Sequence, residues 1–157
     1  MTYEELQMDN EDLNIQELDL SGVSDLKGLY IDGNIAIHQN LTTVEKACVL
    51  SEELGHHHTS TGNILNLKDM RNRKQERTAR LWAYNKQIGL TGIISAFKAN
   101  CHTGYDMADY LGVTEEFLQE ALECYRQIYG TGVTYGNKYM IQFEPNLQIH
   151  TMMFSIE

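Results

Sequence analysis

One stretch of the sequence, residues 51–58 (SEELGHHH), constrains this chain most, because its spacing fits one face of a helix. It follows an apolar run. On a helix Glu52 and His56 lie four residues apart, so both side chains leave the same face. Glu53 lies between them and leans toward that face from one side. A carboxylate and an imidazole on one helical face can hold a metal ion. The stretch therefore predicts a helix that carries a candidate metal site.

This spacing matches the zincin motif His-Glu-x-x-His, in which two histidines bind zinc and the intervening glutamate activates water. Here Glu52 stands at the first ligand position, and its carboxylate is also able to bind a metal. We expect Glu52 and His56 to be metal ligands and Glu53 to be the general base. The alternative is an ordinary acidic helix, because a Glu-Glu-x-x-His pattern often arises by chance.

A mononuclear catalytic zinc needs a third protein ligand, which must come from an element packed against this helix. The next predicted helix covers residues 70–88, and Glu76 is its one acid. Three residues share the face of Glu76 and turn it inward: Ala79, Trp82 and Ala83. An inward carboxylate is costly unless it is paired or binds a metal. We expect Glu76 to be the third ligand, and the alternative is a salt bridge to Arg73 or Arg80.

The other histidines fit this site less well. His57 and His58 project roughly 100° and 200° around the helix from His56. We expect His57 to be a supporting or surface group and His58 to end the helix, where it favours the helix dipole. Both remain open as alternative ligands. Three isolated histidines are expected to be structural or exposed: His38, His102 and His150.

Composition places the chain among soluble globular proteins. It has 157 residues, of which 42% are hydrophobic and 22% charged, enough for one domain with a real core. No run approaches the roughly 20 apolar residues that cross a bilayer, and the acidic N-terminal stretch is unlike a secretory signal. Scattered single cysteines indicate reduced thiols in a cytoplasmic protein: Cys48, Cys101 and Cys124. The formal net charge of −10 opposes nucleic-acid binding, so we expect neither a nucleic-acid nor a membrane partner.

Hydrophobic periodicity predicts a helix-dominated α+β fold. Residues 3–19 predict a short helix or an irregular arm, and residues 28–38 predict two strands joined by an Asp-Gly-Asn turn. Thr42 and Glu45 form a capping box that starts a helix ending at residues 57–58. Its expected buried stripe is Val44, Ala47, Cys48, Leu50 and Leu54. Further helices are predicted over 70–88, 91–100, 105–111 and 115–129, before a terminal hairpin over 133–143.

We expect a single domain over residues 1–157. Its first part, about 26–90, would hold a small antiparallel sheet, the metal-site helix and the helix of the third ligand. Its second part, about 91–157, would be helical and end in the hairpin. The strand at 34–38 alternates and immediately precedes the metal-site helix, so we expect it to be the sheet edge beside which an extended substrate adds.

Two segments raise the alternative of a charged partner. One basic cluster is interleaved with acids, and we interpret it as a solvated helix face, with an anionic partner as the alternative. It consists of Lys68, Arg71, Arg73, Lys74, Arg77 and Arg80. Residues 107–116 resemble a helix-turn-helix segment. Acids at the start of its second helix would repel phosphate, so we interpret this segment as scaffold or as a docking face.

The sequence resembles the ImmA/IrrE family of metallopeptidases, in particular the small versions encoded by prophages and mobile elements of Gram-positive bacteria. The resemblance covers about residues 28–154. It rests on the stretches Gly28 to Ile37 and Glu45 to His57, on Lys74-Gln75-Glu76 with Ala79 and Trp82-Ala83, and on Tyr125, Tyr129-Gly130 and Phe143-Glu144-Pro145.

The resemblance implies a zincin-like fold with Glu53 as catalytic base and His56 and Glu76 as metal ligands. The family's first ligand is commonly histidine, so Glu52 is a departure, and its carboxylate makes Mn²⁺ or Fe²⁺ suitable as well as Zn²⁺. Family members act on helix-turn-helix repressors. The resemblance therefore implies an endopeptidase that cleaves such a repressor and relieves repression of a phage or mobile element. The alternative is a non-catalytic antirepressor that binds and sequesters the repressor.

Overall fold

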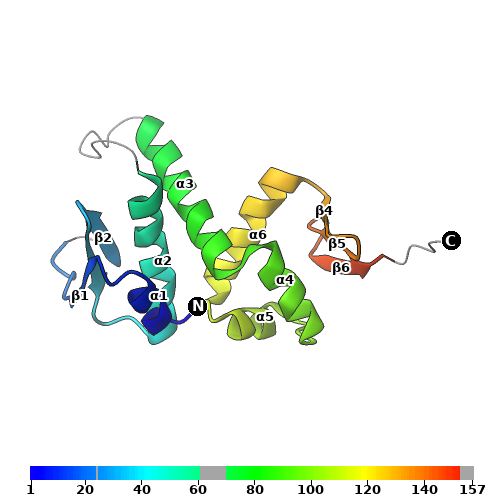
Figure 1. The fold of residues 1–157 in the computed structure, drawn as a ribbon, viewed down its shortest axis with the longest axis horizontal. Helices are drawn as coiled ribbons and strands as arrows, with labels where there is room; N and C mark the ends of the chain where they lie inside the picture. Colours follow the sequence, from blue (N-terminus) through cyan, green and yellow to red (C-terminus); the bar gives the residue numbers. More distant parts are fainter. Residues whose placement is uncertain (24, 61–69, 153–157) are drawn as a thin grey trace.

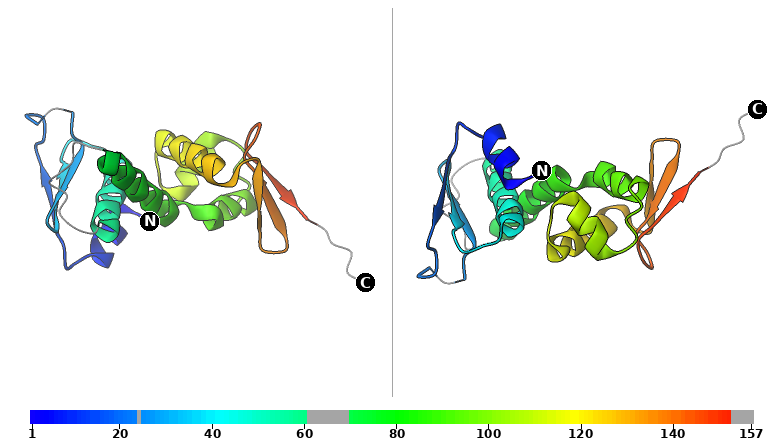
Figure 2. Two further views of the ribbon diagram at one scale, coloured as in Figure 1. Left: turned by 90° about the horizontal axis from the view of Figure 1, so that it is seen from above. Right: turned by 90° about the horizontal axis from the view of Figure 1, so that it is seen from below.

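The computed structural model describes residues 1–23, 25–60 and 70–152. The elements of this part of the chain follow in the order α1 (Tyr3–Asp9), β1 (Asn14–Leu18), β2 (Gly28–Ile31), β3 (Asn34–His38), α2 (Thr43–Thr59), α3 (Met70–Gln87), α4 (Gly89–Lys98), α5 (Gly104–Leu111), α6 (Glu115–Tyr129), β4 (Gly132–Tyr135), β5 (Tyr139–Gln142) and β6 (Gln148–Thr151). Along the long axis a first sheet is followed by α2 and α3, then by α4 to α6, and finally by a second sheet (Figures 1 and 2). The fold is helix-dominated α+β, as the sequence predicts.

The first sheet has the strand order β1-β3-β2. β2 and β3 form the predicted antiparallel hairpin, whose tight turn places Asp32 and Gly33 at positive φ (48° and 81°). β1 pairs in parallel with β3, which brings Ile15 opposite Ile35. The sequence predicted a short helix or an irregular arm over residues 3–19, and α1 is a helix in this segment. It did not predict β1, because most of β1 is exposed and its side chains do not alternate in polarity.

β3 is therefore the central strand, and our expectation that it forms the sheet edge was wrong. Ile35 and Ile37 are buried, and the backbone of β3 pairs on both sides. Alternating polarity shows which face of a strand is buried, but it does not show how many neighbours the strand has. The open edges are those of β1 and β2, and β2 is the one that lies against α2.

α2 and α3 form the most extensive contact between any two elements of the described chain. α2 begins with the predicted capping box: Thr42 accepts a hydrogen bond from the N–H of Glu45, and Glu45 accepts one from the N–H of Thr42. The helices approach closely at Gly55, where a Cβ would lie 2.2 Å from the carbonyl oxygen of Ala79. Gly55 therefore sets the spacing that brings side chains of α2 beside those of α3.

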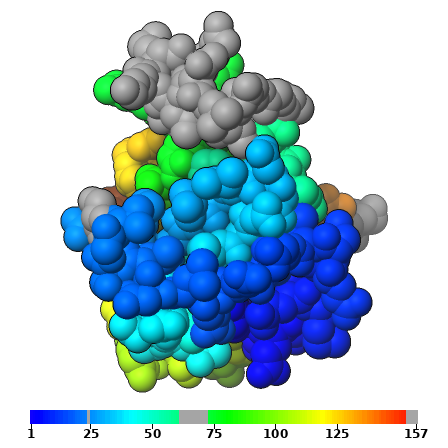
Figure 3. Space-filling model, turned by 90° about the vertical axis from the view of Figure 1, so that its left-hand side faces the viewer, coloured from blue at the N-terminus to red at the C-terminus, as the bar shows by residue number. Residues whose placement is uncertain are grey.

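The described core consists of two clusters. The N-terminal cluster joins α1, β3 and α2 and contains Tyr3, Leu6, Ile35, Ile37, Ala47, Leu50 and Leu54. The C-terminal cluster joins α3 to α6 with the second sheet, and Cys48 of α2 also belongs to it. Val44 is 41% exposed and borders a surface cavity, so it does not belong to the buried stripe that we expected. Figure 3 shows the N-terminal segment, in blue, covering one end of the molecule.

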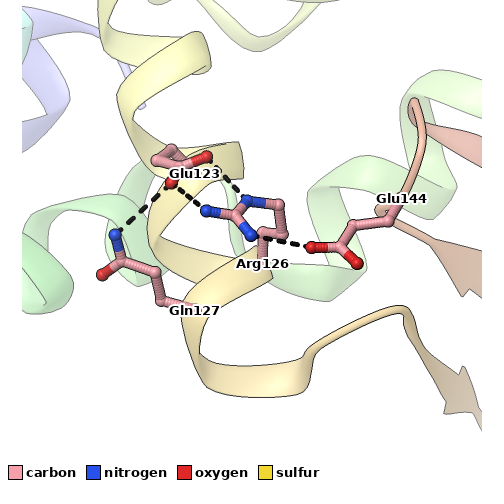
Figure 4. A network of polar contacts seen from close by, with 4 residues as sticks. All are labelled: Glu123, Arg126, Gln127 and Glu144. Carbon is pink, nitrogen blue, oxygen red and sulfur yellow. Dashed lines mark hydrogen bonds and ion pairs between the residues drawn. The ribbon is translucent and has the colours of Figure 1, made fainter.

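The second sheet is antiparallel, with the order β4-β5-β6. β4 and β5 form the predicted terminal hairpin, whereas β6 was not predicted. Arg126 of α6 pairs with Glu123 on the same helix and with Glu144 after β5, where Nη1 lies 2.7 Å from Oε1 (Figure 4). The pair with Glu144 connects α6 to the segment that follows β5, and the pair with Glu123 holds Arg126 in place on the helix.

Candidate active site

The two neighbouring acids of α2, Glu52 and Glu53, are partly buried and line a cavity of about 370 Å³. The cavity lies between α2, the start of β2, α3 and the first turns of α6. His56 follows one turn later on α2 and is also partly buried. The capping box and the apolar stripe of α2 fix the position of all three side chains relative to the sheet.

His56 and Glu76 come into contact across the two helices. Nε2 of His56 lies 2.9 Å from Oε2 of Glu76. The hydrogen bond raises the pKa of His56 and lowers the pKa of Glu76. Ala79 and Ala83 are fully buried, as expected for residues on the inward face of α3. The structure thus brings together two of the three side chains that the sequence suggested as metal ligands.

The second oxygen of Glu76 contacts Arg80. Nε of Arg80 lies 3.3 Å from Oε1 of Glu76, one helical turn away on α3. This is the salt bridge that the sequence left open as an alternative, and it coexists with the His56 contact. Both carboxylate oxygens of Glu76 therefore have a partner within the protein.

Glu52 does not complete a group of three with this pair. Across the described ranges, no three His, Cys, Asp or Glu side chains gather as they would around one metal ion. His56 and Glu76 fit a divalent ion, since imidazole and carboxylate are ordinary zinc ligands. His56 and Glu76 are therefore suited to be two ligands of a metal ion, whereas Glu52, the expected third ligand, does not form a group with them.

Glu53 lies directly against the edge strand β2. A Cβ on Gly28 would lie 3.1 Å from Cγ and from Oε1 of Glu53, and 2.5 Å from Cγ1 of Val49. Glycine at the start of β2 therefore allows the strand to come this close to α2. The result is a carboxyl group held between a cavity and the open edge of a sheet.

Burial raises the pKa of both Glu52 and Glu53 to about 7. At Glu52 the positive charge of Arg80 opposes this effect, and the negative charge of Glu120 adds to it. At Glu53 the charge of His56 opposes it. Carboxyl groups that titrate near neutrality are suited to accepting and returning protons at physiological pH.

His57 and His58 have contacts away from the His56–Glu76 pair. Nδ1 of His57 lies 2.9 Å from the hydroxyl of Tyr30 on β2. His58 stacks on the indole of Trp82, with ring centroids 4.8 Å apart. His57 thus links α2 to β2, and His58 links the last turns of α2 to α3.

A larger cavity of about 830 Å³ lies between α3 and α6, and Glu76 is among its lining residues. Arg80 and Glu120 line both cavities.

The spacing of Glu76 and Arg80 on one helix is a signal that the sequence carried, because residues four apart are neighbours. Nothing local placed Glu120 beside them, since that contact depends on how α6 packs against α3. In the sequence, only the family resemblance pointed to Gly28.

The basic segment of α3 is an exposed helix face wherever the structure describes it. Arg73, Lys74, Arg77 and Arg80 are all exposed. Lys68 and the side chain of Arg71 lie outside the described residues.

The helix pair α2–α3 thus combines an acid beside an edge strand with a histidine–glutamate contact. The sequence matches the peptidase M78 family, described as the IrrE N-terminal-like domain, over residues 8–123, and the chain belongs to this family. This match confirms the resemblance to ImmA/IrrE proteins. It indicates a metallopeptidase-type protein or IrrE-like regulator and implies a divalent metal, typically zinc.

Comparisons with curated proteins and with solved structures gave no match. Within the described residues, none of the helices has the length and apolar character needed to cross a bilayer.

Proposed function

We propose that this chain is a metal-dependent endopeptidase that cleaves a helix-turn-helix repressor and so relieves repression of a phage or mobile element. The observation that carries the proposal is the position of Glu53, between a cavity and the open edge of β2 and three residues before His56. Membership in the M78 family supports the reaction class. The repressor as target follows from the resemblance to ImmA/IrrE proteins.

Glu53 has the properties of a general base. With a pKa of about 7 it is able to take a proton from the attacking water and return it to the leaving amine near neutral pH. His56 and Glu76 would hold the metal, with Glu52 as the proposed third ligand. A divalent ion bound there would act as a Lewis acid. Zn²⁺ is suitable, and Mn²⁺ and Fe²⁺ also suit a site rich in carboxylates.

The open edge of β2 offers a path for an extended substrate. The N–H of His38 donates to the carbonyl of Lys27 at 2.8 Å, so these two residues form a hydrogen-bonded pair at the start of the hairpin. Hydrogen-bonded and non-bonded pairs alternate along antiparallel strands, so the backbone groups of Gly28 and Tyr30 face the open edge. A substrate strand pairing there would pass beside Glu53.

Metal analysis tests the ligand assignment. We expect about one divalent ion per chain in protein equilibrated with Zn²⁺, and we expect His56→Ala and Glu76→Ala each to remove it. His57→Ala is the matched control, because it removes a neighbouring imidazole that contacts Tyr30 instead. Full occupancy in both ligand variants would show that the assignment is wrong.

A second candidate function is a non-catalytic antirepressor that sequesters the repressor. The arrangement of donors favours it, because no third His, Cys, Asp or Glu of the described chain joins His56 and Glu76. Glu53→Gln separates the two functions, since it removes the base and keeps the shape. If the chain is a peptidase, the wild-type protein cleaves the repressor in a reporter strain. The Glu53→Gln variant then leaves the repressor intact and active. Full derepression by the variant, with the repressor uncut, would establish sequestration.

A further inference from the structure

Arg80 borders the candidate site and contacts one of its proposed ligands, although the proposed function gives it no role. It binds Oε1 of Glu76 while His56 binds Oε2. It also lines both cavities, and 51% of its side chain is exposed. Arg80 is therefore positioned to affect anything that binds at the His56–Glu76 pair.

A guanidinium at this position competes with a metal ion in two ways. Arginine keeps its charge throughout the physiological pH range, so it repels a divalent cation bound a few ångströms away. Its Nε also engages one of the two oxygens that Glu76 could offer to the metal. Arg80 and Glu52 also line the same cavity, so the guanidinium borders a second proposed ligand. One cation thus pairs with one proposed ligand and shares a cavity with another.

We propose that Arg80 is an internal counter-cation of the candidate metal centre, which neutralises Glu76 in the metal-free chain and must release it before a metal binds at full affinity. The inference rests on the proposed metal site and deepens it. A simple salt bridge within α3 would contribute little to stability and would not control metal affinity. Removal of Arg80 should therefore strengthen metal binding. Removal of a residue that helps to hold the metal ligands in place would weaken it.

The affinity for Zn²⁺, measured by competition with a chromophoric chelator on the whole chain, tests this inference. The proteins compared are wild type, Arg80→Gln, Arg80→Lys and Arg77→Gln, with circular dichroism to confirm that each is folded. Arg77 is the matched control, because it is an exposed arginine of the same helix that lines the larger cavity. Arg80→Gln should tighten Zn²⁺ binding by at least about tenfold, while the two other variants should stay within about threefold of wild type.

A double variant, Arg80→Gln with His56→Ala, shows whether the gain arises at this site, because the added affinity should then disappear. Equal gains for Arg80→Gln and Arg77→Gln would overturn the inference, since they would reflect net charge alone. Weaker binding by Arg80→Gln would also overturn it, because Arg80 would then support the site. Neither result affects the peptidase proposal. If no variant binds Zn²⁺, the inference and the ligand assignment both fail, while repressor cleavage by wild type still decides the peptidase proposal.

Discussion

At the scale of single residues, the site concentrates two partly buried acids on one turn of α2. Burial raises the pKa of Glu52 and of Glu53 from about 4.5 to about 7. An ionised carboxylate at either position therefore lowers the stability of the fold at neutral pH. Functional sites commonly retain such unfavourable groups because the reaction needs them.

We predict that Glu53→Gln stabilises the metal-free chain at about pH 8 and has little effect at about pH 5. With a folded pKa near 7 and an unfolded pKa near 4.5, the contribution of Glu53 to stability falls as the pH rises between these values and is constant above them. Glutamine is neutral throughout, so it removes the cost only at the higher pH, on the order of 1–3 kcal/mol. Urea unfolding at both pH values, with a chelator present, measures this difference.

An equal effect of the substitution at the two pH values would contradict this prediction. It would mean that Glu53 titrates as an ordinary exposed glutamate. The chelator is needed because a bound cation would favour the ionised form at both pH values.

At the scale of secondary-structure elements, the site depends on how closely α3 lies to α2. Gly55 separates the acids of α2 from His56, and its Cα faces the backbone of Ala79. Alanine normally stabilises a helix relative to glycine by up to about 1 kcal/mol. At Gly55 the added methyl group would meet a carbonyl oxygen at 2.2 Å, so the two helices would have to separate.

We predict that Gly55→Ala lowers stability by about 1–3 kcal/mol, because overpacking outweighs helix propensity. Gly104→Ala is the control: its Cβ would lie at an ordinary 3.4 Å from Nε2 of Gln119, so this change should be neutral or mildly stabilising. Thermal unfolding of both variants measures the contrast. A stabilised Gly55→Ala variant would refute the close approach of α2 and α3.

The placement of the substrate on β2 makes a separate prediction. Proline at Tyr30 removes an N–H that faces the open edge, whereas alanine removes the side chain and keeps the N–H. We predict that Tyr30→Pro lowers repressor cleavage by at least about tenfold relative to Tyr30→Ala, with the two variants similar in melting temperature. If the two variants cleave equally well, substrate does not pair with β2.

Local signals in the sequence predicted the elements that carry the site. The capping box of Thr42 located the start of α2, and the Asp-Gly turn located the β2–β3 hairpin. Strand order depends on contacts far apart in the chain, so the pairing of β1 with β3 was missed and β3 was mistaken for an edge. β6 was missed for the same reason, because its partner β5 defines it more than its own sequence does.

The candidate site was predictable to the extent that helix geometry determines it. The spacing of Glu52, Glu53 and His56 follows from one helix, and the inward face of α3 indicated Glu76. That His56 and Arg80 share the carboxylate of Glu76 could not be read in this way. The sequence offered the Arg80 salt bridge and the metal site as alternatives for Glu76, whereas the folded chain shows His56 and Arg80 on the same carboxylate.

At the scale of the whole molecule, charge distinguishes the proposed partner from nucleic acid. The formal net charge is −10, and acids from α2 and α6 line the cavity beside β2. A protein of this charge lacks the attraction to phosphate that drives non-specific DNA binding. We therefore propose that the chain acts on the repressor protein directly, without contacting DNA or a membrane.

We predict no retardation of operator DNA by the purified chain at about 0.15 M salt, and release or loss of the repressor's own shifted band when the chain is added. A mobility-shift assay with and without the repressor provides both readings. Direct, salt-dependent DNA binding by the chain alone would contradict the assignment of a protein partner.

We propose Glu53 as the base in peptide hydrolysis. Mass spectrometry of the purified repressor incubated with metal-loaded wild type or Glu53→Gln tests it most directly. We predict a defined cut by wild type and a rate at least about 10²-fold lower for the variant, with metal content and folding unchanged. A repressor that stays intact with wild type, or is cut equally fast by both proteins, would contradict the claim.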